Sequence, residues 1–282
     1  HGFFQIGLDR AHDYGTGEGV KIAILDSGLN VNHPDLRDAV TATFNAVTGS
    51  SDVTDSNGHG THVTGIAAAR ANNGEGIVGA APRADIIACL VLPRGGATVG
   101  QVVAGINGAV ARGANVINMS LGVTGYVGEL IEPVRNAERA GTVVVSSSGN
   151  SGEGTSGTPG NVYDAFAVGA SNEDRAIANF SSGETISTGT DWGRLAPDSW
   201  RAEYVVPDAA APGVDVTSAY PVDHPDGPYN AISGTSMASP HVAGVVGLIR
   251  SAAADATPDG AKRALASTAW KPDGEPADPD TR

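Results

Sequence analysis

Short apolar runs alternate along the chain with segments in which apolar residues recur every three or four positions. The runs are rich in Val and Ile and bounded by glycine or polar residues, which predicts buried strands at residues 20–25, 86–92, 116–119, 142–145 and 165–168. Two apolar stripes of helical period lie between them, at residues 102–110 and 130–137, and each is followed by a glycine. Strands that alternate with crossover helices predict an α/β fold with a mostly parallel sheet.

The remaining segments complete the predicted domain. Further helices are expected at residues 59–71, 236–249 and 259–268. The segment 187–204 is polar, carries two tryptophans and has no clear period, so we expect a surface loop there. Residues 271–282 are rich in proline and charge, which is typical of a solvated tail. We therefore expect a single domain over residues 1–270, with a surface excursion at 187–204.

Composition excludes several classes of partner. Seventeen basic residues against 31 acidic ones give a net charge of -14, which repels nucleic acid and anionic membrane surfaces. No stretch approaches the roughly 20 consecutive apolar residues that a membrane helix needs. The single Cys89 lies within an apolar run, so it has no internal disulfide partner and is expected to be buried.

Candidate chemistry follows the predicted strands, where open α/β sheets place their functional groups. Asp26 ends the first strand, and His59 opens a helix between two glycines. His62 follows three residues later, so a metal site is an alternative, but the adjacent glutamate of the zinc-protease motif is missing. Ser236 starts a further helix, whose N-terminus would favour a developing anion on its oxygen. A serine that merely caps its helix is the competing interpretation.

Three motifs in order settle the choice between these interpretations. Asp26-Ser27-Gly28, His59-Gly60-Thr61-His62 and the segment GTSMASPH at residues 234–241 resemble the subtilisin-like serine proteases of the subtilase family. The resemblance covers about residues 21–269. It implies a three-layer α/β domain and a serine endopeptidase that forms an acyl-enzyme intermediate.

The resemblance also implies the roles of individual residues. Ser236 would be the nucleophile, His59 the general base, and Asp26 the residue that orients His59. Asn150 would donate to the oxyanion, although a turn residue is the alternative for this position. The residues implied for substrate binding are Ser120, Leu121, Gly122, Ser147, Ser148 and Gly149. Because these are mostly small, we expect broad specificity with a preference for large uncharged side chains before the scissile bond. A selective processing protease for one partner protein or peptide is the alternative, and a non-catalytic peptide-binding relative is disfavoured by the intact motifs.

Other expectations rest on the resemblance alone. Structural calcium is implied, with Gln5, Asp35 and Asn73 as side-chain ligands and carbonyl groups of residues 72–79 completing the site. The partners implied are protein or peptide substrates and the protein's own removed propeptide, the protein being a secreted monomer. Residues 187–204 are an insertion relative to the family, and we hypothesise that this segment packs over a nearby surface and alters substrate access or stability. We expect no counterpart after Trp270 of the strand that usually follows the family's last helix.

Overall fold

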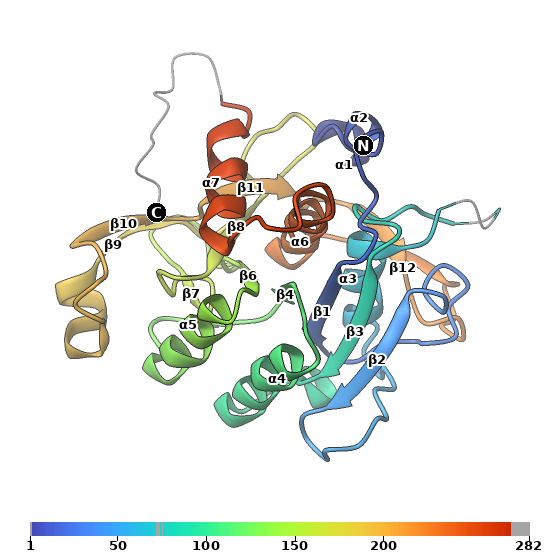
Figure 1. Cartoon of the computed structure of the whole chain (residues 1–282), viewed down its shortest axis with the longest axis horizontal. Helices are drawn as coiled ribbons and strands as arrows, with labels where there is room; N and C mark the ends of the chain where they lie inside the picture. The colour runs from blue at the N-terminus through green and yellow to red at the C-terminus, as the bar shows by residue number, and fades with distance from the viewer. Residues whose placement is uncertain (1, 72–73, 75, 272–282) are drawn as a thin grey trace.

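The computed structural model describes residues 2–71, 74 and 76–271, and its centre is a seven-stranded parallel sheet (Figure 1). The strand order is β11-β8-β6-β4-β1-β3-β2, and each neighbouring pair is parallel. The strands are β1 (Lys21–Asp26), β2 (Val40–Asn45), β3 (Asp85–Leu90), β4 (Val116–Met119), β6 (Val143–Ser147), β8 (Phe166–Ser171) and β11 (Ala209–Pro212). The predicted α/β fold with a parallel sheet between helices is confirmed.

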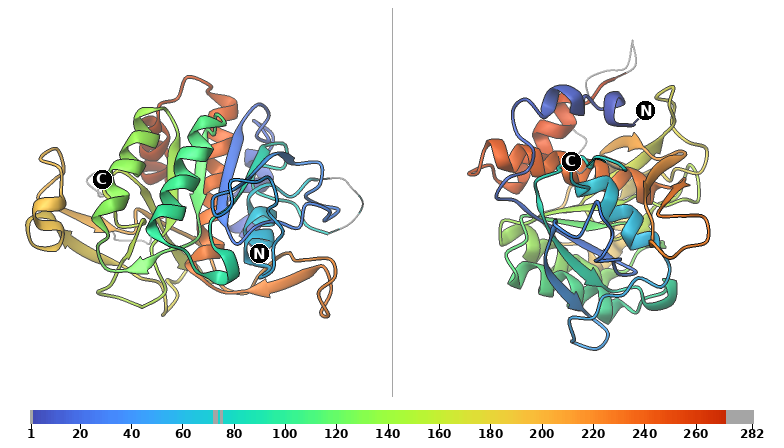
Figure 2. Two further views of the ribbon diagram at one scale, coloured as in Figure 1. Left: turned by 90° about the horizontal axis from the view of Figure 1, so that it is seen from below. Right: turned by 90° about the vertical axis from the view of Figure 1, so that its right-hand side faces the viewer.

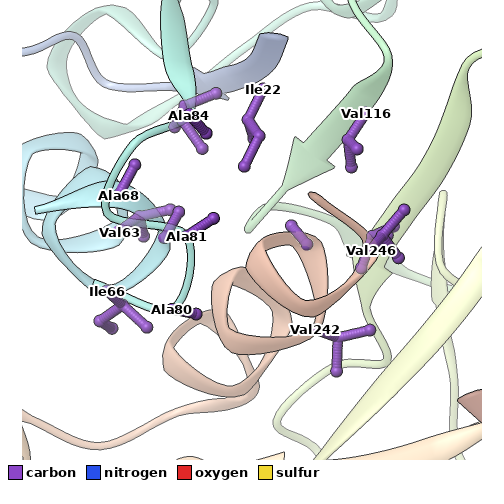
Figure 3. Packing of buried hydrophobic residues seen from close by; sticks show 14 of the residues in the cluster. Ile22, Val63, Ile66, Ala68, Ala80, Ala81, Ala84, Val116, Val242 and Val246 are labelled. Carbon is purple, nitrogen blue, oxygen red and sulfur yellow. The ribbon is translucent and has the colours of Figure 1, made fainter. Parts of the chain in front are cut away.

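The sheet buries both of its faces, because successive residues of each strand point to opposite sides. In β1, Ile22 and Ile24 belong to one hydrophobic core, whereas Ala23 and Leu25 belong to the other. Helices α3 (His59–Ala68) and α6 (Thr235–Ala252) cover the first face, and α4 (Val99–Ala111) and α5 (Ile131–Arg139) cover the second (Figures 1 and 2). Figure 3 shows Val242 and Val246 of α6 together with Ile22 and Val116 of the sheet among the buried residues of the first core. This sandwich fixes the ends of the strands from which the candidate site residues project.

The smaller elements surround this sandwich. The helices are α1 (Gly2–Gln5), α2 (Leu8–Ala11), α7 (Pro258–Thr268) and the short turns η1 (Pro93–Gly95), η2 (Gly128–Leu130), η3 (Thr188–Trp192) and η4 (Gly193–Leu195). The strands form three small antiparallel pairs: β5 (Val123–Thr124) with β7 (Gly157–Thr158), β9 (Glu184–Ser187) with β10 (Glu203–Val206), and β12 (Val216–Ala219) with β13 (Tyr229–Ile232). No helix among the described residues is long and apolar enough to cross a membrane.

Two strands of the central sheet and the end of one helix differ from the sequence-based prediction. Strands β2 and β11 were not expected, because β2 is only partly buried and β11 is mostly alanine. Helix α3 was expected to reach about residue 71 but ends at Ala68. The physical reason is that Arg70 leaves the helix: its N–H donates to Asp35 O, and its guanidinium group donates to the carbonyl groups of Pro82 and Ala84.

The segment 187–204 is mostly exposed, as its polar sequence predicted, but it is a structured excursion and not an irregular loop. It forms the end of the β9–β10 hairpin, which also includes η3 and η4. Trp192 and Trp200 are only 2% and 7% exposed, because they pack into the second core. The hypothesis that this segment packs over a nearby surface therefore holds for its side chains. Its status as an insertion stays a prediction, and the expected tail lies outside the described residues except for Lys271.

Candidate active site

Asp26 and His59 meet at the carboxyl end of β1. The Asp26 side chain is 1% exposed, and its Oδ1 lies 2.7 Å from His59 Nδ1. The same Oδ1 accepts the Ser27 N–H at 2.7 Å. Helix α3 can start this close to β1 because residue 60 is glycine: a side-chain carbon there would clash with Gly28 O. Gly60 therefore allows α3 to lie close enough to β1 for the His59 imidazole to contact the Asp26 carboxylate.

A second buried carboxylate, Asp55, holds the start of α3. Its Oδ1 accepts the Gly58 N–H at 2.8 Å and the Ser27 hydroxyl at 2.9 Å. Its Oδ2 accepts the Thr61 N–H and the Thr61 hydroxyl at 2.9 and 2.6 Å. These bonds satisfy N–H groups that have no partner within the helix and place a negative charge at the helix N-terminus. The sequence motifs do not reveal Asp55, because it lies three residues before the N-cap Gly58, where no capping side chain is expected.

The environment of His59 changes its proton affinity. Burial lowers the pKa of His59, but the carboxylate of Asp26, its hydrogen bond and the more distant Asp55 raise it by more. The net result is a pKa above the ordinary value of 6.5. The site therefore stabilises a protonated imidazole, which is the form that a general base takes after it has removed a proton.

Ser236 lies at the second position of α6 and is half-buried. Its hydroxyl donates to Ser120 O at 3.2 Å, and the Ser120 hydroxyl donates to Ser236 O at 2.8 Å. Among the described residues, no hydrogen bond joins Ser236 Oγ to the ring of His59. The structure thus fastens Ser236 to Ser120 at the end of β4, with its hydroxyl directed at a backbone carbonyl. A serine hydroxyl changes its partner by rotation about a single side-chain bond.

Asn150 follows β6 and contacts the residue before Ser236. Its Oδ1 accepts both the N–H and the hydroxyl of Thr235 at 2.9 Å, which fixes the orientation of the amide group. The Nδ2 group then points to the other side. A side-chain carbon on Gly234 would lie 3.7 Å from Asn150 Nδ2 and 3.7 Å from Ser236 N. Two N–H donors therefore border one small space at the N-terminus of α6.

The expected substrate-binding residues lie in two groups that share a neighbour, β7. Gly122 approaches β7 so closely that a side-chain carbon would lie 3.0 Å from Thr158 O. On the other side, the Gly157 N–H donates to Ser148 O at 2.9 Å. The first group consists of Ser120, Leu121 and Gly122 after β4, and the second of Ser147, Ser148 and Gly149 at the end of β6. Each group therefore reaches β7 through one residue, Gly122 from the first and Ser148 from the second.

His62 and Cys89, the remaining candidates, are buried side chains of the protein interior. His62 Nε2 lies 3.0 Å from the carbonyl oxygens of Val216 and Asn230, so this nitrogen carries a proton and is not free to bind a metal. Burial lowers the pKa of His62 to about 4. Burial also raises the pKa of Cys89 to about 12, which keeps its thiol protonated.

The three expected calcium ligands have different surroundings. Asp35 is fully buried, and its Oδ2 accepts hydrogen bonds from the Tyr229 hydroxyl and the Ile77 N–H. Gly76 lies so close that a side-chain carbon there would clash with Asp35 Oδ2. Gln5 instead donates to Asn172 O at 2.9 Å, and its buried Oε1 has no partner among the described residues. No hydrogen bond joins Gln5 to Asp35 in the described part of the chain. Asn73 lies outside the described residues. Asp35 therefore contacts Gly76 and Ile77 of the expected ligand segment, whereas Gln5 binds Asn172 through Nε2 and its Oε1 stays a predicted ligand.

Comparison with known proteins gives one consistent result. A model of the subtilase family matches residues 17–281. The chain is 39% identical over 248 residues to thermitase from Thermoactinomyces vulgaris, across 88% of this chain and 80% of thermitase. It is 38% identical over 251 residues to subtilisin Savinase from Lederbergia lenta, across 88% of this chain and 83% of Savinase. A solved structure of proteases from Pseudoalteromonas arctica PAMC 21717 has a TM-score of 0.78 at 30% identity, across 94% of this chain and 87% of that chain.

The fold and these similarities define a serine endopeptidase of the subtilisin type, which acts on protein substrates. The chain belongs to the subtilase family. The resemblance inferred from the three motifs is thereby confirmed.

Proposed function

We propose that Ser236 attacks the peptide carbonyl carbon, with His59 as general base. Asp26 orients His59 and stabilises the positive charge of its protonated ring. The observation that carries this proposal is the 2.7 Å contact between His59 Nδ1 and Asp26 Oδ1. It leaves Nε2 of the ring as the nitrogen that takes the hydroxyl proton when Ser236 turns from Ser120. The raised pKa of His59 supports this direction of transfer.

The oxyanion of the tetrahedral intermediate would be bound by Asn150 Nδ2 and the Ser236 N–H. Both donors border the same space beside Gly234, at the positive end of the α6 dipole. His59 then gives its proton to the leaving amine, and the acyl group stays on Ser236 Oγ. Water then attacks this ester, with His59 taking a proton from the water and returning it to Ser236 Oγ. This step releases the carboxylic acid product and restores the serine.

The test is the Ser236→Ala variant, measured with casein and with a chromogenic peptide that has a large apolar residue before the cut. Turnover should fall roughly a million-fold, the size of the loss known for a subtilisin that lacks its nucleophile. Labelling by a serine-directed phosphonate should disappear as well. Wild-type turnover by the variant would contradict the proposal.

We further propose broad cleavage with a preference for large uncharged side chains before the scissile bond. The residues around β7 are glycines, serines and one leucine, which leave room and carry no charge. Sequencing of the fragments from a mixed protein digest tests this point. Cuts after many large apolar residues support it, whereas a single conserved cut site would support the selective processing protease instead.

We also propose a structural calcium held by Asp35 and the carbonyl groups of residues 72–79. The support is the packing of Gly76 and Ile77 against the buried Asp35 carboxylate. Addition of a chelator should lower the melting temperature of the wild type but not that of Asp35→Asn. An equal melting temperature of the wild type with and without chelator would contradict this site.

The finer biological setting follows the family resemblance. We propose a secreted monomer that is made with a propeptide. Light scattering of the purified protein at several concentrations tests the oligomeric state. Activity in the culture medium, together with the mass of the secreted product, tests secretion and processing.

A further inference from the structure

The β9–β10 hairpin packs its inner face into the molecule next to the proposed substrate pocket. Ile186, Tyr204 and Val206 are at most 2% exposed, and they belong to the second core together with Trp192. Figure 1 and the left view of Figure 2 show the hairpin at one end of the molecule. The hairpin is thus a fixed part of the fold.

A chain of buried hydrogen bonds leads inward from this hairpin. The indole N–H of Trp192 donates to the Tyr204 hydroxyl at 2.7 Å, and that hydroxyl donates to Asn161 O at 2.7 Å. The Tyr204 hydroxyl therefore acts as acceptor and donor at once, which fixes its direction. Polar groups in such a buried chain are costly to leave unpaired, so the three residues hold one another in place.

The side chain of Asn161 connects this chain of hydrogen bonds to β5 and β7. It is fully buried, and its Nδ2 donates to Gly125 O and to Ser156 Oγ, both at 2.9 Å. Its Oδ1 lies 2.8 Å from the hydroxyl of Thr158, which itself lies 2.7 Å from Gly125 O. Asn161 thereby ties the end of β5 to β7.

β5 and β7 lie between the two groups of proposed substrate-binding residues. Val123 pairs with Thr158, one residue after Gly122. Gly157 donates its N–H to Ser148 O. The pocket residues are small, so the distance between these backbone segments sets the width of the pocket more than any side chain does.

A second contact joins the hairpin to the same segment. The Tyr126 hydroxyl donates to Glu184 Oε1 at 3.0 Å, and the Tyr126 ring meets Trp192 edge to face at a centroid distance of 5.0 Å. Tyr126 follows β5 by two positions. The hairpin therefore holds this segment from two directions.

We propose that the β9–β10 hairpin sets the width of the pocket for the side chain before the scissile bond, with Tyr204 and Asn161 as positioning residues. This inference rests on the proposed assignment of the pocket residues. Loss of the Tyr204 hydroxyl would release Asn161 and let β5 and β7 separate. A loosened pocket would bind a large side chain less well, whereas a small side chain, which does not fill the pocket, would be little affected.

The experiment compares kcat/KM for two peptides that differ only in Phe or Ala before the cut. In Tyr204→Phe, which keeps the ring, the Phe-to-Ala ratio should fall roughly three- to tenfold, mainly through a higher KM for the Phe peptide. Titration with a serine-directed phosphonate should still label the variant completely. Tyr126→Phe keeps the ring but loses the hydroxyl contacts with Glu184 and Ser156, so it should shift the ratio in the same direction and provides a second route to the same segment.

The matched control is Trp200→Phe. Trp200 is buried in the same hairpin and meets the rings of Trp192 and Tyr204 edge to face, but its indole N–H donates to Asp164 at 2.8 Å. Trp200→Phe therefore changes ring packing and removes no hydrogen bond of the Asn161 chain. It should lower the melting temperature and leave the ratio within about twofold of the wild type. An unchanged ratio in both tyrosine variants, or an equal change in Trp200→Phe, would overturn the inference. A wild type that cleaves neither peptide and resists titration would instead overturn the proposed function.

Discussion

His59 Nδ1 and Asp26 Oδ1 lie 2.7 Å apart, and this contact couples the protonation of the histidine to a buried carboxylate. Burial alone would lower the pKa of His59, yet the two carboxylates near it raise the pKa above 6.5. A base must be neutral to accept a proton, so the acid limb of the pH profile of kcat/KM should lie above pH 6.5. The free energy of unfolding depends on the same titration. The pair of protonated His59 and Asp26 stabilises the fold fully below pH 6.5, and this stabilisation is lost as the pH rises through the folded-state pKa of His59.

Replacement of Asp26 by Asn should lower the pKa of His59, because the largest favourable charge is removed while the burial remains. NMR titration of the His59 ring in the inactive Ser236→Ala background measures this shift without self-digestion. Asp52→Asn, which removes an exposed carboxylate that accepts from Thr54, should leave the titration unchanged. An unaltered His59 titration in the Asp26 variant would show that the contact does not set the pKa.

Asp55 should matter for the placement of His59 as much as for stability. Asp55→Ala leaves the Gly58 and Thr61 N–H groups without their buried acceptor, which should cost about 2–4 kcal/mol in the free energy of unfolding. Urea unfolding measures this cost. Because the start of α3 carries His59, kcat should fall more than KM changes. Asp55→Asn, which keeps one oxygen acceptor, should lose less on both counts, and equal losses in the two variants would contradict this account.

The Thr235 hydroxyl should contribute to catalysis through Asn150. Asn150→Ala should lower kcat roughly a hundred- to a thousand-fold, the range known for a subtilisin that lacks this donor. Thr235→Val removes one of the two donors that orient the Asn150 amide, so kcat should fall by roughly tenfold while KM changes little. Thr235→Ser keeps the hydroxyl and should retain wild-type turnover. A Thr235→Val variant with unchanged kcat would show that the backbone N–H alone orients Asn150.

The sequence predicted the central strands and the candidate site residues because these carry local signals. Strand β1 is a continuous apolar run, and Asp26, His59 and Ser236 each lie in a dense motif. Thr235 and Asn161 were missed because only folding brings Asn150 and Gly125 next to them, and Asp55 was missed because it does not lie at the N-cap of α3. The β9–β10 hairpin was missed for a related reason: Trp192 and Trp200 are buried by residues distant in sequence, so their own segment shows no period. Gln5 stays a predicted calcium ligand that rests on the family resemblance, and its contact with Asn172 could not be predicted because the two residues meet only in the folded chain.

A buried ion pair away from the site should give the fold a pH dependence of its own. Glu138 Oε2 lies 3.0 Å from Lys262 Nζ, and Glu138 Oε1 accepts the Val144 N–H at 2.7 Å. Burial raises the pKa of Glu138 from 4.5 to about 7, although Lys262 opposes this shift. The folded state therefore binds a proton that the unfolded state has lost between these pH values, and stability should decrease as the pH rises from 4.5 to about 7. The change attributable to Glu138 is on the order of 3 kcal/mol.

Urea unfolding of Ser236→Ala at a series of pH values, with and without Glu138→Gln, isolates this contribution. The glutamine keeps an acceptor for the Val144 N–H but does not titrate, so the difference between the two curves should follow the Glu138 pKa. Lys262→Met removes the charge that opposes the shift, so it should extend the pH range of the decrease upward. Curves that stay parallel in all three proteins would mean that Glu138 remains ionised in the fold, because the ion pair with Lys262 then outweighs the cost of burial.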